Sequence, residues 1–450
     1  MEDRQRYSLS YRAAETRQVM DWVRAGQCGC VVGLRGAGKS NFVRFLLRAD
    51  VQQSYLGQDQ AHFAFVLVNL LSLTERSEWG VYEMMLNNLL EQLCPPDIAD
   101  EIILETRTLH QETMRTRDVL SAQRAVERCM ALLCQQPTRR FVFLFDEFDA
   151  VFRELPASLF RCLRAMRDAH KGQVSYLVVA THDLAGLRDD LGGETDHFYR
   201  LVTRNPCWLG PYSEADARLM IDGLASRRSL ELGEEDTKRV LQLSGGHAGL
   251  LKAILSLLWN EKNSVVLTPT LAKDAAIVRE CRRVWGGLSD SEQAALRAFS
   301  NGERPGQRML DSLAARGLLQ GKGNAQTIFS PLLTSFAREQ AAHPRTGTHI
   351  DRSLGIAQIE GRRIGNLTEL EFELLCYLYE HRGRICTKND LIECVYRQQY
   401  NFGKDGLSDE MLQALVSRLR KKIETEPGRP RYIATARGEG YRFVAPDSNK

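Results

Sequence analysis

Gly33-Leu34-Arg35-Gly36-Ala37-Gly38-Lys39-Ser40 is the stretch that decides the fold of this 450-residue chain. It matches the pattern G-x-x-x-x-G-K-[ST], which joins a strand to a helix. The apolar run 28–32 leads directly into it and residues 41–48 continue as a helix, so both flanks have the required character. The stretch therefore predicts a phosphate-binding loop at the start of an α/β domain.

The residue types of this loop suit a nucleotide. Glycines let backbone N–H groups close around phosphates, and the helix N-terminus adds a partial positive charge. We expect Lys39 to reach the β- and γ-phosphates of ATP, and the Ser40 hydroxyl to bind Mg²⁺. A glycine-rich turn without a ligand is the alternative. The remaining residues predicted to contact the nucleotide here are Gly33, Gly36, Gly38 and Asn41.

A second apolar run, at 141–145, ends in acidic residues. An acid at the carboxyl end of a buried strand can hold hydrated Mg²⁺, and we expect Asp146 to do so. Glu147 is placed to polarise an attacking water. Helix capping is the alternative for both residues, and it is the better explanation of Asp149.

A third run, 176–180, ends in Thr181, which we expect to sense the γ-phosphate from the neighbouring strand; His182 is interpreted as a loop residue. These runs, together with 63–70, alternate with segments of helical length. That alternation predicts a parallel sheet covered by helices, as in an α/β P-loop NTPase core.

The next part of the chain is predicted to be helical. Residues 213–226, 234–243 and 248–259 have helical apolar spacing, and Ser289 with Glu292 forms a capping-box pattern. A helix at 309–316, ended by Gly317, and a hairpin at 318–329 then follow. Helices followed by a hairpin predict a winged helix.

Composition limits the function classes. The balance of 60 Lys/Arg against 57 Asp/Glu is not that of a strongly basic nucleic-acid-coating protein. No apolar run approaches the ~20 residues of a membrane span, and no secretory signal begins the chain. The 11 cysteines form no C-x-x-C pair, so reduced thiols fit better than disulfides or a zinc site. We expect a cytoplasmic protein without a membrane partner.

The order of these motifs resembles the STAND and origin-recognition-like branch of AAA+ ATPases over roughly residues 10–340. The resemblance implies that Pro211 and His247 contact the nucleotide, although each has a purely structural alternative. It also implies an arginine finger, for which several arginines remain open. These candidates are Arg139, Arg140, Arg200 and Arg204.

The C-terminal region is similar to the winged-helix effector domain of OmpR/PhoB-type response regulators. Residues 418–442 hold eight Lys/Arg and three acids, a local excess of +5, which leaves −2 for the rest. The resemblance places Arg418 and Arg420 on a helix that reads the DNA major groove and Arg437 at the wing tip. A solvated helix end is the alternative. The other predicted DNA contacts are Lys421, Lys422 and Arg442.

Asp409 and Glu410 depart from that family, because acids at the start of the reading helix repel phosphate. Five segments are expected in all: an ATPase core at 1–205, a helical lid at 206–285, a winged helix at 286–340, a linker at 341–352 and a DNA reader at 353–450.

The leading hypothesis is an ATP-binding, nucleotide-switched DNA-binding protein. We expect a bacterial transcriptional regulator that binds double-stranded DNA, forms homo-oligomers with ATP and hydrolyses ATP slowly. A protein or ligand trigger is possible. The alternatives are a DNA-loading or transposition-type AAA+ ATPase, and an NLR-like sensor ATPase of bacterial defence.

Overall fold

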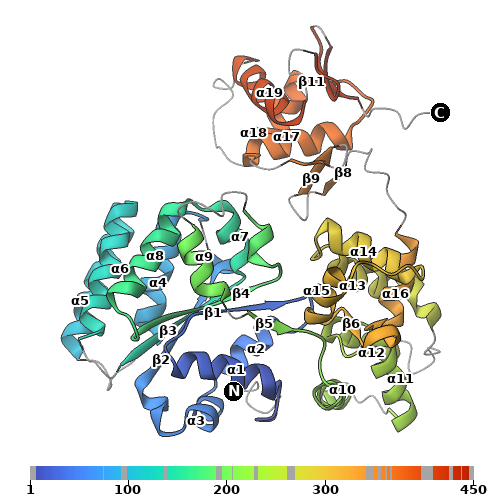
Figure 1. Cartoon of the computed structure of the whole chain (residues 1–450). Coiled ribbons are helices and arrows are strands. Elements are labelled where there is room, and N and C mark those ends of the chain that lie inside the picture. Colours follow the sequence, from blue (N-terminus) through green and yellow to red (C-terminus); the bar gives the residue numbers. More distant parts are fainter. Residues whose placement is uncertain are drawn as a thin grey trace. The chain divides into compact units, whose positions relative to one another are not determined.

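The computed structural model describes residues 7–73, 75–92, 99–135, 139–188, 195–204, 206–227, 232–260, 269–340, 349–351, 356–359, 362–364, 367–396, 409–424, 429–436 and 438–444. The chain divides into two compact units, Met1–Glu339 and Gln340–Lys450 (Figure 1). The first unit contains two apolar clusters and the second unit one, so each unit is described separately.

A five-stranded parallel sheet forms the centre of the first unit (Figure 1). Its order is β2-β3-β4-β1-β5, so β1 lies between two strands formed much later in the chain. The strands are buried on both faces, as their continuous apolar runs require. They are β1 (Gly29–Gly33), β2 (Phe63–Asn69), β3 (Arg140–Asp146), β4 (Val174–Ala180) and β5 (Pro206–Leu209).

Alternate residues of these strands belong to two different cores. In β3, Val142 and Leu144 pack into one cluster, and Phe141, Phe143 and Phe145 into the other, as the two-residue period of a strand dictates. Helices cover both faces (Figure 1). On one face lie α1 (Ala13–Arg24), α2 (Lys39–Leu46) and α3 (Ala49–Leu56). On the other lie α4 (Glu78–Gln92), α5 (Asp100–Thr116), α6 (Val119–Leu133), α7 (Phe148–Glu154), α8 (Ala157–Ala169) and α9 (Asp196–Thr203).

A helical lid and a winged helix complete the first unit. The lid consists of α10 (Glu214–Arg227), α11 (Glu234–Ser244), α12 (Ala248–Asn260) and α13 (Ala275–Trp285). The winged helix consists of α14 (Asp290–Ser300), α15 (Gln307–Ala315), β6 (Leu319–Gln320), β7 (Thr327–Ile328) and α16 (Pro331–Glu339). The capping box predicted at Ser289 and Glu292 is present in both directions and begins α14. Short 3₁₀ turns are η1 (Gly57–His62), η2 (Leu70–Ser72), η3 (Leu184–Gly186), η4 (Pro269–Lys273) and η5 (Gly323–Ala325).

The second unit is a three-helix winged fold between two small sheets. Its helices are α17 (Glu369–Glu380), α18 (Lys388–Tyr396) and α19 (Asp409–Ile423). One antiparallel sheet has the order β10-β9-β8 and the other β11-β13-β12. Their strands are β8 (His349–Asp351), β9 (Ile356–Ile359), β10 (Arg362–Arg363), β11 (Cys386–Thr387), β12 (Ile433–Ala436) and β13 (Gly440–Phe443).

The predicted fold class, with its P-loop core, lid, winged helix and C-terminal winged helix, is confirmed. Two details were wrong. Strand β5 was not anticipated, and residues 349–351 pair with β9 instead of belonging wholly to a linker. Within the described residues, no helix has the length and apolar character needed to cross a membrane.

Candidate functional site

The P-loop lies where β1 ends and α2 begins, at the carboxyl edge of the sheet. Gly38 is the residue before α2 and has φ +92°, and a Cβ there would also collide with the Tyr212 hydroxyl. Only glycine meets both demands. The first backbone N–H groups of α2, at Lys39, Ser40 and their neighbours, have no acceptor within the helix and carry its positive dipole end. The loop can therefore bind a phosphate chain.

Lys39 connects two strands at this edge. Its Nζ donates to the carbonyl oxygen of Gly33 at 3.2 Å and to the hydroxyl of Thr181 at 2.8 Å. Burial lowers the pKa of Lys39, and the Glu147 carboxylate opposes that shift. The structure thus brings Lys39 and Thr181 together, 142 residues apart in the chain, as the strand-end argument expected.

The two acids after β3 lie beside the P-loop. Burial raises the pKa of Asp146, and the nearby Ser40 hydroxyl opposes that shift. A neighbouring hydroxyl and carboxylate form a suitable oxygen pair for Mg²⁺, which prefers hard ligands. Glu147 has φ +57°, an uncommon conformation for a residue with a side chain, and burial raises its pKa.

Asp149 does not act as the expected helix cap. Its carboxylate accepts hydrogen bonds from the backbone N–H groups of Thr181 and His182, at 2.8 and 2.9 Å, and bonds to the His182 ring at 2.8 Å. Burial alone would raise the pKa of Asp149, but these bonds hold it below its usual value. The prediction was wrong because the carboxylate joins the first turn of α7 to the residues that follow β4.

His247 is fully buried and contacts the P-loop backbone. Its Nε2 donates to the Arg35 carbonyl oxygen at 2.9 Å, while its Nδ1 accepts from the backbone N–H of Leu250 at 3.3 Å. Burial lowers the pKa of His247 to about 4, so the ring is neutral at pH 7.

Pro211 lies in the segment that leads to the lid, between Gly210 and Tyr212, and packs on Gly317 of the winged helix.

Sequence reasoning missed two buried arginines at this site. One guanidinium NH2 of Arg12 donates to the carbonyl oxygens of Ala37 at 2.9 Å and Gly210 at 2.8 Å. Arg316, at the end of α15, donates to the Thr181 carbonyl oxygen at 3.0 Å and to the carboxylate of Glu292. No motif contains either residue, so no local signal could identify them.

The four arginine-finger candidates all lie at the opposite edge of the sheet. Arg140 starts β3 and donates to the Arg24 carbonyl oxygen, with Arg139 before it. Arg200 and Arg204 end α9, where they line a cavity of about 560 Å³ together with Arg164, Arg167 and Lys171. None of the four is therefore placed at its own chain's P-loop.

The predicted DNA contacts of the second unit fall into two groups. Arg418 and Lys421 on α19 and Arg442 on β13 are exposed. Arg420, in contrast, donates to the Ile433 carbonyl oxygen and the Thr435 hydroxyl, and Lys422 forms an ion pair with Glu371 at 2.6 Å.

Those contacts tie Arg420 and Lys422 to their own domain, whereas Arg418, Lys421 and Arg442 are exposed and form no ion pair within the described residues. Arg437 lies outside the described residues. The acids at the start of α19, Asp409 and Glu410, are at the helix N-terminus as expected.

Two family models match the chain. The model described as Novel STAND NTPase 1 matches residues 2–302, two thirds of the chain. The model described as Transcriptional regulatory protein, C terminal, matches residues 361–443. The first match ends within the winged helix of the first unit, and the second lies inside the C-terminal unit.

Curated relatives match only the C-terminal part. The alkaline phosphatase synthesis transcriptional regulatory protein PhoP of Bacillus subtilis is 40% identical over 84 residues, which are 19% of this chain and 33% of PhoP. The regulatory protein VanRc of Enterococcus gallinarum is 36% identical over 75 residues, or 17% of this chain and 30% of VanRc. The chain therefore spans about a third of the length of these relatives.

Among solved structures, the Walker-type ATPase of Pyrococcus abyssi has 14% identity and a TM-score of 0.44, covering 73% of this chain and 95% of its own. The Aeropyrum pernix ORC2 protein has 12% identity and a TM-score of 0.40, covering 72% and 92%. The Klebsiella pneumoniae RstA DNA-binding domain has 29% identity and a TM-score of 0.19, covering 22% and 90%.

Proposed function

Because the chain belongs to the family of Novel STAND NTPases 1 and ends in a transcriptional-regulator DNA-binding domain, we propose that it is an ATP-dependent transcriptional switch. ATP with Mg²⁺ binds the P-loop unit, and the state of the nucleotide decides whether several C-terminal domains are presented to double-stranded DNA together. The observation that carries this proposal is the direct contact of the lid and winged helix with the P-loop and the end of β4.

Three backbone carbonyl groups around the phosphate site make those contacts, and a fourth accepts from the segment before α1. His247 and the backbone N–H of Gly249, both of the lid, bond to the carbonyl oxygens of Arg35 and Gly36. Arg12, just before α1, donates a hydrogen bond to the Ala37 carbonyl oxygen. Arg316 of the winged helix donates one to the Thr181 carbonyl oxygen. A phosphate chain entering the loop must share this small region with them, so its binding energy can be used to move the lid and winged helix.

The positions of the core residues support a role for each of them in the proposed reaction. Lys39 neutralises the β- and γ-phosphates, and the N–H groups from Gly36 to Asn41 surround them. Ser40 and Asp146 hold Mg²⁺, while Glu147 orients the attacking water. Thr181 senses the γ-phosphate through the hydroxyl that now accepts from Lys39.

DNA binding is assigned to the exposed cations of the second unit. Arg418 and Lys421 lie on α19 and Arg442 on the β12–β13 wing. Each phosphate contact adds only a modest term to the affinity, so one domain alone gains limited affinity from these three cations. Oligomers formed with ATP raise affinity through effective concentration. Arg200 and Arg204 are the finger candidates best placed to meet a neighbouring subunit, since their cavity is at the molecular surface.

Substitution of the P-loop lysine tests nucleotide binding. Lys39→Ala removes the charge that faces the phosphates, so we expect ATP affinity to fall at least a hundredfold, about 2.7 kcal/mol. Isothermal titration calorimetry on the full chain measures this. Arg115→Ala, which removes an exposed cation from α5, is the control. Unchanged affinity in Lys39→Ala would contradict the phosphate site.

Substitution of the acid after β3 tests hydrolysis. Glu147→Gln keeps the size and position of the side chain but cannot polarise water, so we expect retained ATP affinity and a turnover reduced about a hundredfold. Phosphate release measures turnover. Equal turnover in Glu147→Gln and the parent chain would remove Glu147 from this role.

The complete switch is tested by sizing the protein with ATP, with ADP and without nucleotide, each with and without genomic DNA fragments. A regulator gives larger particles with ATP and retains a restricted set of sequences. A DNA-loading ATPase instead gives DNA-stimulated turnover without sequence preference. If size and DNA retention are the same in all nucleotide states, the proposed switch is wrong.

A further inference from the structure

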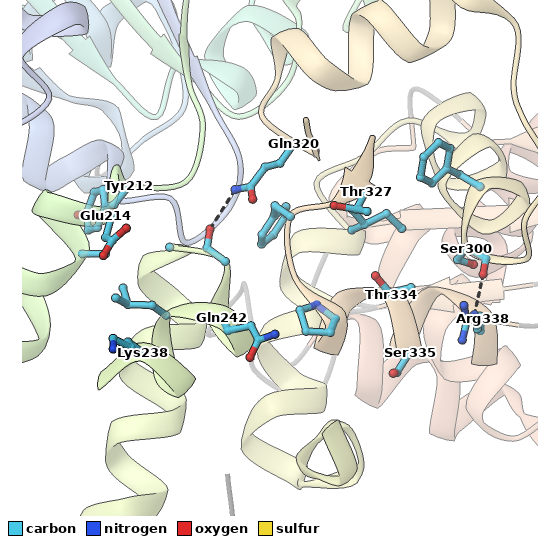
Figure 2. Close-up of a pocket in the computed structure, with 18 residues that line it drawn as sticks. Tyr212, Glu214, Lys238, Gln242, Ser300, Gln320, Thr327, Thr334, Ser335 and Arg338 are labelled. Carbon is cyan, nitrogen blue, oxygen red and sulfur yellow. Dashed lines mark hydrogen bonds between the residues drawn. The ribbon is translucent and has the colours of Figure 1, made fainter. Parts of the chain in front are cut away.

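A cavity of about 900 Å³ lies between the lid and the winged helix of the first unit, separate from the P-loop (Figure 2). Figure 2 shows Lys238 and Gln242 on the lid side and Thr334, Ser335 and Arg338 on the winged-helix side. Neither the phosphate site nor the DNA contacts use it. Its volume is that of a small-molecule site.

The lining combines an apolar surface with a few polar groups. Phe299, Phe329 and Leu241 supply apolar surface, and the hydroxyl groups of Thr334 and Ser335 lie in the same cavity. Such a mixture is typical of sites that bind an apolar body and orient it by a small number of hydrogen bonds.

The charges of the cavity favour an anion. Lys238 and Arg338 are both exposed, and neither forms an ion pair within the described part of the chain. Arg338 keeps only its Nε occupied, by the Ser300 carbonyl oxygen at 2.6 Å. The single acid of the lining, Glu214, pairs with Arg218 at 3.0 Å, and Arg218 also pairs with Glu234 at 2.9 Å. The lining therefore holds two cations and one carboxylate, an excess of one positive charge.

One wall of the cavity is also a neighbour of the nucleotide site. The Phe329 ring stacks on His247, with 5.7 Å between ring centroids and 29° between planes. His247 in turn donates to the P-loop carbonyl of Arg35. Gly245 lies against the Phe329 carbonyl so closely that a Cβ could not fit, so the lid and the hairpin are in tight contact here.

We propose that this cavity binds a small amphipathic organic anion, with an aromatic or aliphatic body and a carboxylate or sulfonate group, and that its occupancy weakens ATP binding. The anionic group faces Lys238 or Arg338 and the body packs on Phe299 and Phe329. A bound ligand bridges the lid and the winged helix and so stabilises the arrangement in which His247 holds the P-loop. The effect on ATP rests on the proposed nucleotide switch; the binding site itself does not.

Binding is tested with anilinonaphthalene sulfonate, an aromatic body with one sulfonate, by calorimetry on the full chain. Ser335→Trp fills the cavity and is expected to weaken the probe at least about tenfold, whereas Ser335→Ala leaves affinity within about twofold. Lys238→Glu is expected to weaken it about threefold. The matched reversal Lys171→Glu, at an exposed position of the P-loop domain, is expected to have no effect. Thermal unfolding of each variant must match the parent.

Equal probe affinity in Ser335→Trp and the parent would overturn the site, because a probe held elsewhere is insensitive to that residue. The effect on ATP is measured separately by titrating ATP with and without saturating probe. We expect ATP to bind about fivefold more weakly in the presence of the probe. In Phe329→Leu, which keeps an apolar side chain but loses the ring that stacks on His247, the difference in ATP affinity with and without the probe should be smaller. ATP affinity that is unchanged or higher with the probe would overturn the proposed effect of the cavity on ATP binding. A parent chain that binds the probe but never binds ATP would instead reject the proposed switch and leave the site standing.

Discussion

The functional cations of the two units differ in burial and in their hydrogen-bond partners. Around the P-loop, Lys39, Arg12 and Arg316 are buried, and each donates to backbone carbonyl groups of other elements. In the C-terminal unit, Arg418 and Lys421 are exposed and free of ion pairs within its described residues.

Buried and exposed cations differ in how strongly their interactions depend on salt. A buried cation has lost its hydration, so its contacts must stay complete, and its effects depend little on salt. An exposed cation acts through long-range attraction and counterion release, so its effects depend strongly on salt. The P-loop unit is suited to a change of conformation, and the C-terminal unit to reversible attachment to a polyanion.

The largest effect is expected for the buried ion pair of the winged helix. Arg316→Met leaves the Glu292 carboxylate buried without its partner, so we expect a loss of about 3–5 kcal/mol in the free energy of unfolding. Urea unfolding of the full chain, monitored at low and high salt, measures this. The double variant Arg316→Met/Glu292→Met removes both charges and should recover most of the loss. A loss under 1 kcal/mol in the single variant would mean that the pair is effectively solvated.

An intermediate effect is expected from protonation of His247. The folded-state pKa is about 4 against an ordinary 6.5, so the unfolded chain binds the proton first as pH falls. The contribution of His247 is therefore present above pH 6.5 and is lost between pH 6.5 and 4. It amounts to about 2 kcal/mol between pH 7 and pH 5. Unfolding of the parent and of His247→Gln across this range should show a shallower slope for the variant; identical slopes would contradict a neutral, buried ring.

The smallest effect is expected for the exposed cations. Arg418→Ala/Arg442→Ala removes two charges from the C-terminal unit, so DNA affinity should fall about tenfold at low salt, and the slope of log affinity against log salt should become shallower by about 1–2. Fluorescence anisotropy with duplex DNA measures both. Arg17→Ala/Arg115→Ala removes the same charge from the ATPase core and should change neither. A double variant with the parent's slope would remove these residues from the DNA interface.

The sequence was sufficient to predict which side chains meet at the carboxyl ends of the strands. Parallel strands deliver their carboxyl ends to one edge, so the proximity of Lys39, Asp146 and Thr181 followed from three apolar runs and their last residues. The Ser289 capping box was equally predictable, because all its parts lie within four residues.

Contacts between distant segments could not be read in this way. Arg12 and Arg316 reach the P-loop region across 25 and 135 residues, and neither has a local pattern. The ion pair of Lys422 with Glu371 joins two helices, so the sequence alone counted Lys422 among the free cations. Strand β5 was not predicted because it has only four residues and begins with proline. Proline argues against a central strand but is tolerated in an edge strand such as this one.

The order of the sheet has a consequence for biosynthesis. Strand β1 is made early, yet its two neighbours are β4 and β5, which end at residues 180 and 209. At ribosomal speeds of about 5–20 residues per second, this apolar strand remains unpaired for roughly 10–30 s after its synthesis. During that time β2 and β3 can pair with each other but cannot close the sheet. The nascent P-loop unit is therefore a natural client for a chaperone that shields an extended apolar segment until the second half of the core emerges.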